Sequence, residues 1–375
     1  MGTKKKRSIN VARPDIGKEE LAEVEAVFKT GWLGMGDRVF KFENALKSMF
    51  KRKYAVCVNT GTSGMHLAAD SLGLSKNDEV IVPSLTFVAT PQAIIACGGK
   101  PVFCDVELDD LNISIRHMKS LITKKTRAVM PVHYGGSPCQ MDEILRIARE
   151  RGVTVIEDAA HAFGSQYAGR LVGSFGDLTC FSFDPIKNMT CGEGGAILTD
   201  DDRLADIIIK KRILGIDKDT WNRYKHKRSW FYEVHTMGYR YHMSNINAAI
   251  GLAQLKKFCA FKKIRRAICK LYDRELAGVK NVKFLVRDYD NIVPFNYTIL
   301  VPRRDELMAF LQKKGIGTVI NYIPNHLQPL FAGVKVKLPN TDAAYKRMVS
   351  IPVHAAMTVD DARFVAGAIK EFYRA

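Results

Sequence analysis

Apolar runs of strand length alternate with helical patterns between residues 12 and 214. The runs are rich in Val, Ile, Phe and Cys, and the segments between them carry apolar residues at helical spacing. This alternation predicts a mostly parallel sheet covered by helices, in which ligands bind at the carboxyl ends of the strands. The predicted strands are 54–59, 79–83, 101–105, 127–133, 153–156 and 196–199, and the predicted helices include 12–31, 88–96, 142–151 and 202–214.

The composition changes near Asn247, where a long helix is predicted to run past Tyr272. We place a domain boundary at its start, which gives a large domain over 1–246 and a smaller α/β domain over 247–375. Before it, the basic and aromatic stretch 221–241 lacks clear periodicity, which predicts an ordered loop or an exchanged arm. Beyond it the pattern predicts strands at 294–301 and 318–322, a helix at 304–314 that ends at Gly315, and a terminal helix with a capping box of Thr358 and Asp361.

A short glycine-rich loop in the middle of the chain holds a lysine. Phe181-Ser182-Phe183 is typical of the end of a half-buried strand, Pro185 ends the ladder, and glycines at 192, 194 and 195 allow tight turns. An ammonium in partly apolar surroundings loses hydration, so its pKa falls and the neutral amine can form a Schiff base with a carbonyl. We therefore interpret Lys187 as the lysine that binds pyridoxal phosphate. The alternative is a solvated surface lysine, one of 57 lysines and arginines.

An anion site is predicted where strand 54–59 meets the next helix. The turn 60–64 reads T-G-T-S-G, and a helix that carries Met65 begins there. Free N–H groups and the positive end of the helix dipole meet at such a turn, and Thr62 and Ser63 would add hydroxyl donors. The same hydroxyls are equally expected of ordinary helix caps.

A pair of carboxylates follows strand 153–156 at the same edge of the sheet. One of two consecutive residues leaving a strand points inward, so either Glu157 or Asp158 needs a cation there. The protonated pyridine nitrogen of the cofactor would be that cation, and the pairing keeps the ring an electron sink. The alternative is a carboxylate that caps the following helix or meets an arginine. His161 would ordinarily satisfy a local hydrogen bond, but its place beside Asp158 favours a role at the site.

The formal charge of +18 would suit a nucleic-acid-binding protein, because phosphate contacts dominate that affinity. However, the basic residues are scattered among 39 acidic ones, and the local clusters at 4–7, 223–228 and 256–266 accompany no nucleic-acid-binding motif. The same charge would steer an anionic small substrate.

Neither a membrane span nor a secretory signal is expected. No apolar stretch approaches the roughly 20 residues of a span, and the basic residues 4–7 precede no apolar segment. We therefore expect a soluble cytoplasmic protein. The eight cysteines form neither a C-x-x-C pair nor a zinc-like pattern with histidine, so we expect no metal site and interpret them as small buried side chains in a reducing compartment.

Four motifs occur in a fixed order: G-T-S-G at Gly61, V-P-S-L-T-F-V-A-T at Val82, V-I-E-D-A-A-H at Val155 and F-S-F-D-P-I-K-N at Phe181, the last followed by G-E-G-G. Together they closely resemble the DegT/DnrJ/EryC1/StrS family of pyridoxal-phosphate sugar aminotransferases. The resemblance covers nearly the whole chain, from the Trp32 loop through G-Y-R-Y-H-M at 238–243 to the end. It implies the aspartate-aminotransferase-like fold (type I), a homodimer with sites at the subunit interface, and glutamate as the usual amino donor.

The resemblance also implies a role for each matching residue. Lys187 matches the Schiff-base lysine, Asp158 matches the partner of the pyridine nitrogen, and Phe87 matches the aromatic ring stacked on the cofactor. Thr62, Ser63 and Ser182 match phosphate ligands around the Gly61 turn, and His161 stands where many members have glutamine near the cofactor hydroxyl. Arg240 stands where many members have an asparagine that reaches the neighbouring subunit's phosphate. Tyr322 and His326 match a segment near the sugar, and Trp32 is expected to shape the substrate pocket.

The sequence therefore predicts an aminotransferase that uses pyridoxal phosphate and its aminated form to move an amino group from glutamate to a nucleotide-linked keto sugar. The expected position is C4 of a 4-keto-6-deoxyhexose carried by UDP, GDP or dTDP, and C3 is an open alternative. A dehydratase of the same family is expected to have histidine in place of the lysine, so Lys187 argues against it. A nucleic-acid-binding protein on the same fold is the alternative from another class. Such a protein has no need to keep Asp158, Lys187 and the Gly61 turn together.

Overall fold

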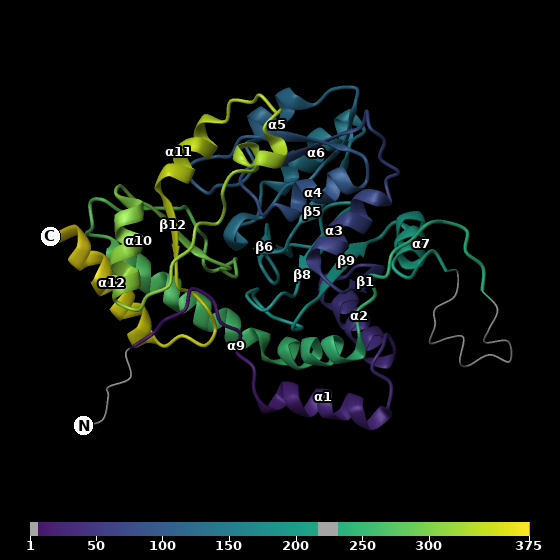
Figure 1. Ribbon diagram of the computed structural model, residues 1–375, viewed down its shortest axis with the longest axis horizontal. Helices are drawn as coiled ribbons and strands as arrows, with labels where there is room; N and C mark the ends of the chain where they lie inside the picture. The colour runs from purple at the N-terminus through teal and green to yellow at the C-terminus, as the bar shows by residue number, and fades with distance from the viewer. Residues whose placement is uncertain (1–6, 217–231, 375) are drawn as a thin grey trace.

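The computed structural model describes residues 7–216 and 232–374, and its centre is a seven-stranded sheet (Figure 1). Its strands are β1 (Tyr54–Val58), β2 (Glu79–Pro83), β3 (Lys100–Cys104), β4 (Thr126–Val129), β5 (Thr154–Asp158), β8 (Leu178–Ser182) and β9 (Gly195–Thr199). Their order is β1-β9-β8-β5-β4-β2-β3. The strands from β8 to β3 are paired in parallel, and β9 runs antiparallel to both of its neighbours. The predicted mostly parallel sheet is therefore confirmed.

Helices cover both faces of this sheet. On one face α3 (Gly61–Asp70), α4 (Ala89–Ala96) and α7 (Asp202–Lys211) pack on Val56, Val82 and Ile197. On the other face, α2 (Asp37–Phe50), α5 (Ile115–Leu121) and α6 (Met141–Arg151) pack on the alternate residues of the same strands. Because of this double cover, every residue of β8 is buried, and the prediction of a half-buried strand there is wrong.

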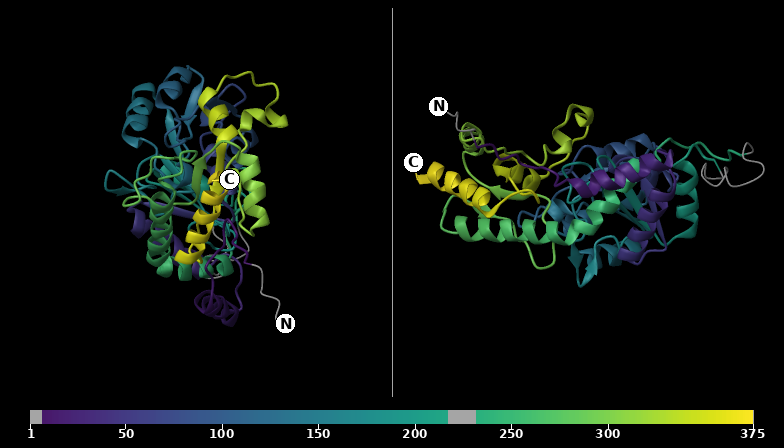
Figure 2. Two further views of the ribbon diagram at one scale, coloured as in Figure 1. Left: turned by 90° about the vertical axis from the view of Figure 1, so that its left-hand side faces the viewer. Right: turned by 90° about the horizontal axis from the view of Figure 1, so that it is seen from below.

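The helix α9 (Asn245–Leu276) connects the large sheet to a smaller α/β unit. Its first half packs in the core of the large sheet through Phe258 and Phe261, and its second half packs in a separate core through Leu271. Figures 1 and 2 show α1 (Lys18–Thr30) and α12 (Val359–Arg374) alongside α9. The smaller unit contains β10 (Lys283–Phe284), β11 (Tyr297–Leu300) and β12 (Met348–Ile351) in an antiparallel sheet, with α10 (Arg304–Lys313) and α11 (Pro339–Arg347).

The remaining short elements are the hairpin of β6 (Gln166–Tyr167) and β7 (Arg170–Leu171) and the 3-10 turns η1 (Tyr134–Gly136), η2 (Asn325–Leu327) and η3 (Pro329–Phe331). The first described residues join the smaller unit: Ile9 pairs with Ile316 and lies in its core, and Arg7 forms an ion pair with Asp361 at 2.6 Å. The division of the chain into domains 1–246 and 247–375 stays a prediction.

Several predicted elements differ from the observed ones. The predicted helix 12–31 begins only at Lys18, where Glu20 accepts a hydrogen bond from the Gly17 amide at 2.7 Å. Its predicted apolar residues Leu21 and Phe28 are 69% and 59% exposed. The prediction of a strand at 318–322 is wrong, because Val319 alone pairs there, with Ser350 of β12, before the chain turns toward the large sheet.

Other local predictions are confirmed. Gly31 ends α1 in the left-handed conformation (φ 70°), and Thr358 and Asp361 form the reciprocal capping bonds at the start of α12. Six of the eight cysteines are buried, all eight are free thiols, and Cys259 is exposed. Residues 221–231 of the predicted arm lie outside the described residues, as do 223–228 and most of 4–7. Within residues 7–216 and 232–374 no helix has the length and hydrophobicity to cross a bilayer.

The helix α9 also holds the loop that carries Lys187. Asn247 donates from its side-chain amide to the Cys191 carbonyl at 2.8 Å, and Gln254 accepts from the Thr190 amide at 3.3 Å. Between them Gly251 lets the helix approach the loop closely, since a Cβ atom there would lie 2.6 Å from Cys191 Sγ. The spacing 247, 251 and 254 places all three residues on one face of the helix.

We predict opposite effects for two Gly→Ala substitutions in helices. Gly251→Ala should lower the thermal unfolding temperature, because the added methyl overpacks Cys191 at a cost of about 1–3 kcal/mol. Gly367→Ala in α12 is the control: no atom lies within 4 Å of its added methyl, so helix propensity should raise stability by up to about 1 kcal/mol. Calorimetric melting of both variants measures this, and equal shifts would contradict the close approach of α9 to the loop.

Candidate functional site

A cavity lies at the carboxyl ends of β1, β2, β5 and β8, where the parallel sheet predicts a ligand site. It encloses about 800 Å³ of empty space, part of it open to solvent. Eight predicted site residues line it together: Gly61, Thr62, Phe87, Asp158, His161, Ser182, Lys187 and Tyr322.

Asp158 is the last residue of β5 and is 3% exposed. Its carboxylate accepts hydrogen bonds from Thr90 Oγ1 at 2.8 Å and from the Ala160 amide at 3.1 Å. Burial raises the pKa of Asp158 above its ordinary value, although these bonds and the charge of Lys187 act against the rise. The hydrogen bonds and the charge of Lys187 therefore do not fully offset the desolvation of the carboxylate, as expected of a group that binds a cationic ligand.

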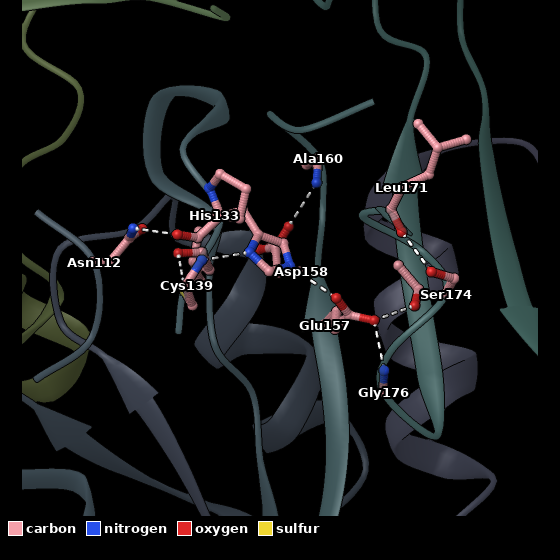
Figure 3. A network of polar contacts seen from close by, with 12 residues as sticks. Asn112, His133, Cys139, Glu157, Asp158, Ala160, Leu171, Ser174 and Gly176 are labelled. Carbon is pink, nitrogen blue, oxygen red and sulfur yellow. Dashed lines mark hydrogen bonds and ion pairs between the residues drawn. The ribbon is translucent and has the colours of Figure 1, made fainter. Parts of the chain in front are cut away.

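The neighbouring Glu157 is held on the other side of the strand. It accepts from Thr179 Oγ1 and the Gly176 amide, both at 2.7 Å, and from His133 Nε2 at 3.0 Å. Burial acts to raise the pKa of Glu157, but these bonds hold it below its ordinary value. Figure 3 shows Asp158 directed to Ala160 and Glu157 directed to Gly176. Of the two carboxylates, only Asp158 faces the cavity.

Lys187 lies on a loop closed by backbone hydrogen bonds. The amide of Phe183 donates to the Gly194 carbonyl at 2.8 Å, and the amide of Cys191 donates to the Phe183 carbonyl at 2.9 Å. Lys187 Nζ lies 4.5 Å from the centroid of the Phe295 ring. With the described residues it makes neither a hydrogen bond nor an ion pair. Burial lowers the pKa of Lys187, against the opposing charges of Asp158 and Asp184, so the amine is closer to its nucleophilic neutral form.

A buried arginine that the sequence reasoning missed fixes this loop from behind. Arg265 of α9 is 2% exposed and donates from Nη2 to the Lys187 carbonyl at 3.3 Å. Its Nη1 donates to the carbonyls of Phe295 at 3.4 Å and Val353 at 3.1 Å. Thus one guanidinium binds main-chain carbonyls of the lysine loop, of the residue whose ring lies near the amine, and of the smaller unit. The available signal was that Arg265 falls on the apolar stripe of α9, in phase with Phe258 and Phe261.

The start of α3 forms the opposite end of the cavity. Gly61 packs against β8 so closely that a Cβ atom there would lie 2.7 Å from Ser182 Cβ. The first amides of the helix have no partner within it, and the hydroxyl-bearing Thr62 and Ser182 face the cavity beside them. The hydroxyl of Ser63 instead donates to Asn59 Oδ1 at 2.7 Å, and Ser63 and Thr60 form a capping box. Its predicted contact to phosphate stays a prediction.

These residues fit the phosphorylated pyridine aldehyde that the sequence resemblance implies. The unpaired amine of Lys187 suits the aldehyde carbon, and the undercompensated carboxylate of Asp158 suits a protonated ring nitrogen. Phe87 is 53% exposed although it is apolar, and it offers a flat face to the cavity. The helix start with Thr62 and Ser182 suits a phosphate.

Of the other predicted residues, two share the cavity wall and three lie outside the cavity. His161 and Tyr322 share a hydrogen bond of 2.8 Å at the cavity wall. His326 binds Ser84 Oγ at 2.8 Å and Asp342 at 3.1 Å and does not line the cavity. Trp32 and Arg240 line a second cavity together with Leu214 and His242.

Known proteins are similar to this chain over nearly its whole length. The sequence pattern of the DegT/DnrJ/EryC1/StrS aminotransferase family matches residues 14–370. An uncharacterized protein of Methanocaldococcus jannaschii, MJ1066, is 40% identical over 96% of each chain. The spore coat polysaccharide biosynthesis protein SpsC of Bacillus subtilis is 36% identical over 100% of this chain and 99% of its own. The solved structure of the putative sugar aminotransferase Spr1654 from Streptococcus pneumoniae, in its PMP-form, superimposes with a TM-score of 0.92 at 25% identity over 98% and 99% of the two chains.

We predict that Lys187→Met stabilises the protein in the absence of cofactor. The folded state lowers the pKa of Lys187 below its ordinary 10.5, so the native state penalises the ammonium. That penalty is fully present below the folded pKa and disappears as the pH rises toward 10.5. The gain in melting temperature should therefore be largest near neutral pH and shrink at alkaline pH. A variant that melts below the wild type at pH 7 would contradict the desolvated amine.

Proposed function

This chain belongs to the DegT/DnrJ/EryC1/StrS aminotransferase family, and from that premise we propose that it moves an amino group from glutamate to the keto group of a nucleotide-linked sugar. It is a pyridoxal-phosphate-dependent sugar aminotransferase of fold type I. The observation that carries the proposal is the unpaired amine of Lys187 in a cavity that also holds the buried carboxylate of Asp158.

Pyridoxal phosphate, when bound, supplies an electron-poor ring that accepts the electron pair of a bond broken at the donor's α-carbon. Lys187 would hold its aldehyde carbon, and Asp158 its ring nitrogen. Thr62 and Ser182, with the amides at the start of α3, would hold the phosphate. Phe87 would cover one face of the ring.

The two titratable groups have separate tasks. Asp158 would keep a proton on the ring nitrogen of a bound cofactor, because a buried carboxylate with a raised pKa is stabilised most by a cation beside it. With the cofactor bound, Lys187 Nζ would be the base that takes the proton from the donor's α-carbon and would later act as the acid that returns it. Burial favours this role, since a lowered pKa leaves a larger fraction of the amine free to take a proton.

The proposed acceptor is a 4-keto-6-deoxyhexose linked to UDP, GDP or dTDP, aminated at C4. Support for a sugar as the acceptor comes from the sugar aminotransferases among the similar structures and from SpsC, a protein of polysaccharide biosynthesis. Incubating the aminated enzyme with C3-keto and C4-keto sugars separates the two positions, because only the true acceptor restores the absorbance of the aldehyde form.

We also propose that the active form is a homodimer in which each chain completes the other's site. Among the described residues that line the cavity, Lys187 is the one cationic side chain, whereas Asp158, Asp184 and Glu193 are anionic. Glutamate and a nucleotide diphosphate are both anions, so binding needs cations from elsewhere. Arg240 is an exposed arginine at the second cavity and is the proposed contribution of the neighbouring chain.

Lys187→Ala should leave a folded protein that binds no cofactor covalently and transfers no amino group. Borohydride reduction of the wild type loaded with pyridoxal phosphate should fix the adduct on the peptide that contains Lys187, as read by mass spectrometry. Transamination by the alanine variant, or an adduct on another lysine, would refute the assignment.

Mixed dimers test the contribution of Arg240. Lys187→Ala and Arg240→Ala chains should each be inactive or weak alone, with Arg240→Lys as the control that keeps the charge. After co-expression the mixture should regain about a quarter of wild-type activity, because half of the dimers are mixed and each contains one intact site. Full activity of Arg240→Ala alone, or an inactive mixture, would exclude the exchange.

A further inference from the structure

His161 and Tyr322 form a pair that joins the two halves of the fold at the cavity wall. His161 follows β5 of the large sheet, and Tyr322 comes from the smaller unit. Their Nε2 and Oη atoms lie 2.8 Å apart, and both side chains line the cavity. Which atom donates in this hydrogen bond decides where the tyrosine hydrogen points.

The other nitrogen of the ring settles the donor. His161 Nδ1 faces the backbone amide of Gly135, with an N···N distance of 3.4 Å. An amide can only donate, so Nδ1 carries the lone pair. The ring is 4% exposed and is stacked on Phe295 with centroids 4.0 Å apart. Burial, with the charges of Lys187 and Arg287, lowers the pKa of His161 well below its ordinary value, so the ring is neutral and its one hydrogen is on Nε2.

The hydrogen on Nε2 fixes the hydroxyl of Tyr322. Nε2–H donates to Oη, so the tyrosine hydrogen cannot point back to the ring. Burial raises the pKa of Tyr322, so the hydroxyl keeps its hydrogen. The side chain of Asn321 also interacts with this hydroxyl, and because the interaction acts to lower the pKa of Tyr322, Asn321 is a donor to Oη and not an acceptor. The remaining direction is the cavity that Tyr322 lines.

We propose that His161 is a positioning residue, which turns the Tyr322 hydroxyl so that it donates a hydrogen bond to an oxygen of the acceptor sugar. The proposal rests on the proposed function for the identity of the sugar, but the state of the ring does not. An oxygen of the sugar needs a hydrogen-bond donor. The carboxylates of Asp184 and Glu193 in the same cavity can only accept hydrogen bonds, so the neutral Tyr322 hydroxyl suits that oxygen. The contact of His161 with the cofactor that the resemblance implies stays a prediction, and the hydrogen bond to Tyr322 is a separate contact of the same ring.

The state of the ring can be observed without any ligand. Solid-state NMR of sedimented protein labelled with ¹⁵N in its histidine rings should show, for the signals lost in His161→Gln, a protonated Nε2 and an unprotonated Nδ1. The signals should be the same at pH 6 and pH 8. A hydrogen on Nδ1, or a doubly protonated ring at pH 6, would overturn the proposal.

Three variants test the role in the reaction. Tyr322→Phe and His161→Leu should each slow the discharge of the aminated enzyme by UDP- or dTDP-4-keto-6-deoxyglucose by about tenfold, as expected for one lost hydrogen bond. His161→Gln keeps an N–H donor and should recover most of the rate. In all three variants the affinity for pyridoxal phosphate and the rate of amination by glutamate should fall much less than the rate of discharge by the sugar.

The outcomes distinguish an acceptor oxygen of the sugar from an acceptor oxygen of the cofactor. If Tyr322→Phe weakens the binding of pyridoxal phosphate and slows the glutamate half-reaction to the same extent, the hydroxyl serves the cofactor and the proposal is wrong. Equal losses in His161→Gln and His161→Leu would likewise exclude the donor role. If the wild type accepts no amino group from glutamate, the proposed function fails, while the NMR result still decides the state of the ring.

Discussion

The site depends on keeping an amine inside a cavity without giving it a counter-ion. A desolvated ammonium costs free energy, and an ordinary protein would remove that cost with a salt bridge. Here the nearest carboxylates interact with Lys187 only at a distance, and its amine lies over the ring of Phe295. The position of the amine therefore has to be fixed through the main chain of its loop, because no salt bridge to a described residue fixes it.

The main chain is fixed by contacts behind the loop. Arg265 binds the carbonyl of Lys187, and Asn188 donates to the carbonyls of His161 and Val293, both at 3.1 Å. These bonds reach α9 and the segment that carries Phe295, so the position of the amine depends on residues of both units. The Arg265 guanidinium is bound through Nη1 and Nη2 by main-chain carbonyls, and within the described part of the chain no carboxylate binds it.

Much of this arrangement was predictable from the sequence, because its determinants are local. The strand 79–83 has the predicted bounds, and the motifs around Asp158 and Lys187 combine a strand end with a turn. The helix α2 was missed although Val39, Phe42 and Leu46 recur at helical spacing. Arg265 and Phe295 were missed for a different reason. The apolar stripe of α9 indicates that Arg265 is buried, but the partners of both residues lie far away in sequence, and no local pattern encodes those contacts.

The segment around Ile9 packs against residues that are synthesised much later. Ile9 completes a core whose other members come from residue 268 onward, and its amide binds the Gly315 carbonyl at 2.8 Å. This core therefore cannot close until most of the polypeptide has left the ribosome, whereas the large sheet is complete at residue 199. During synthesis, Ile9 therefore cannot make its native contacts until the residues of the smaller unit have also been made.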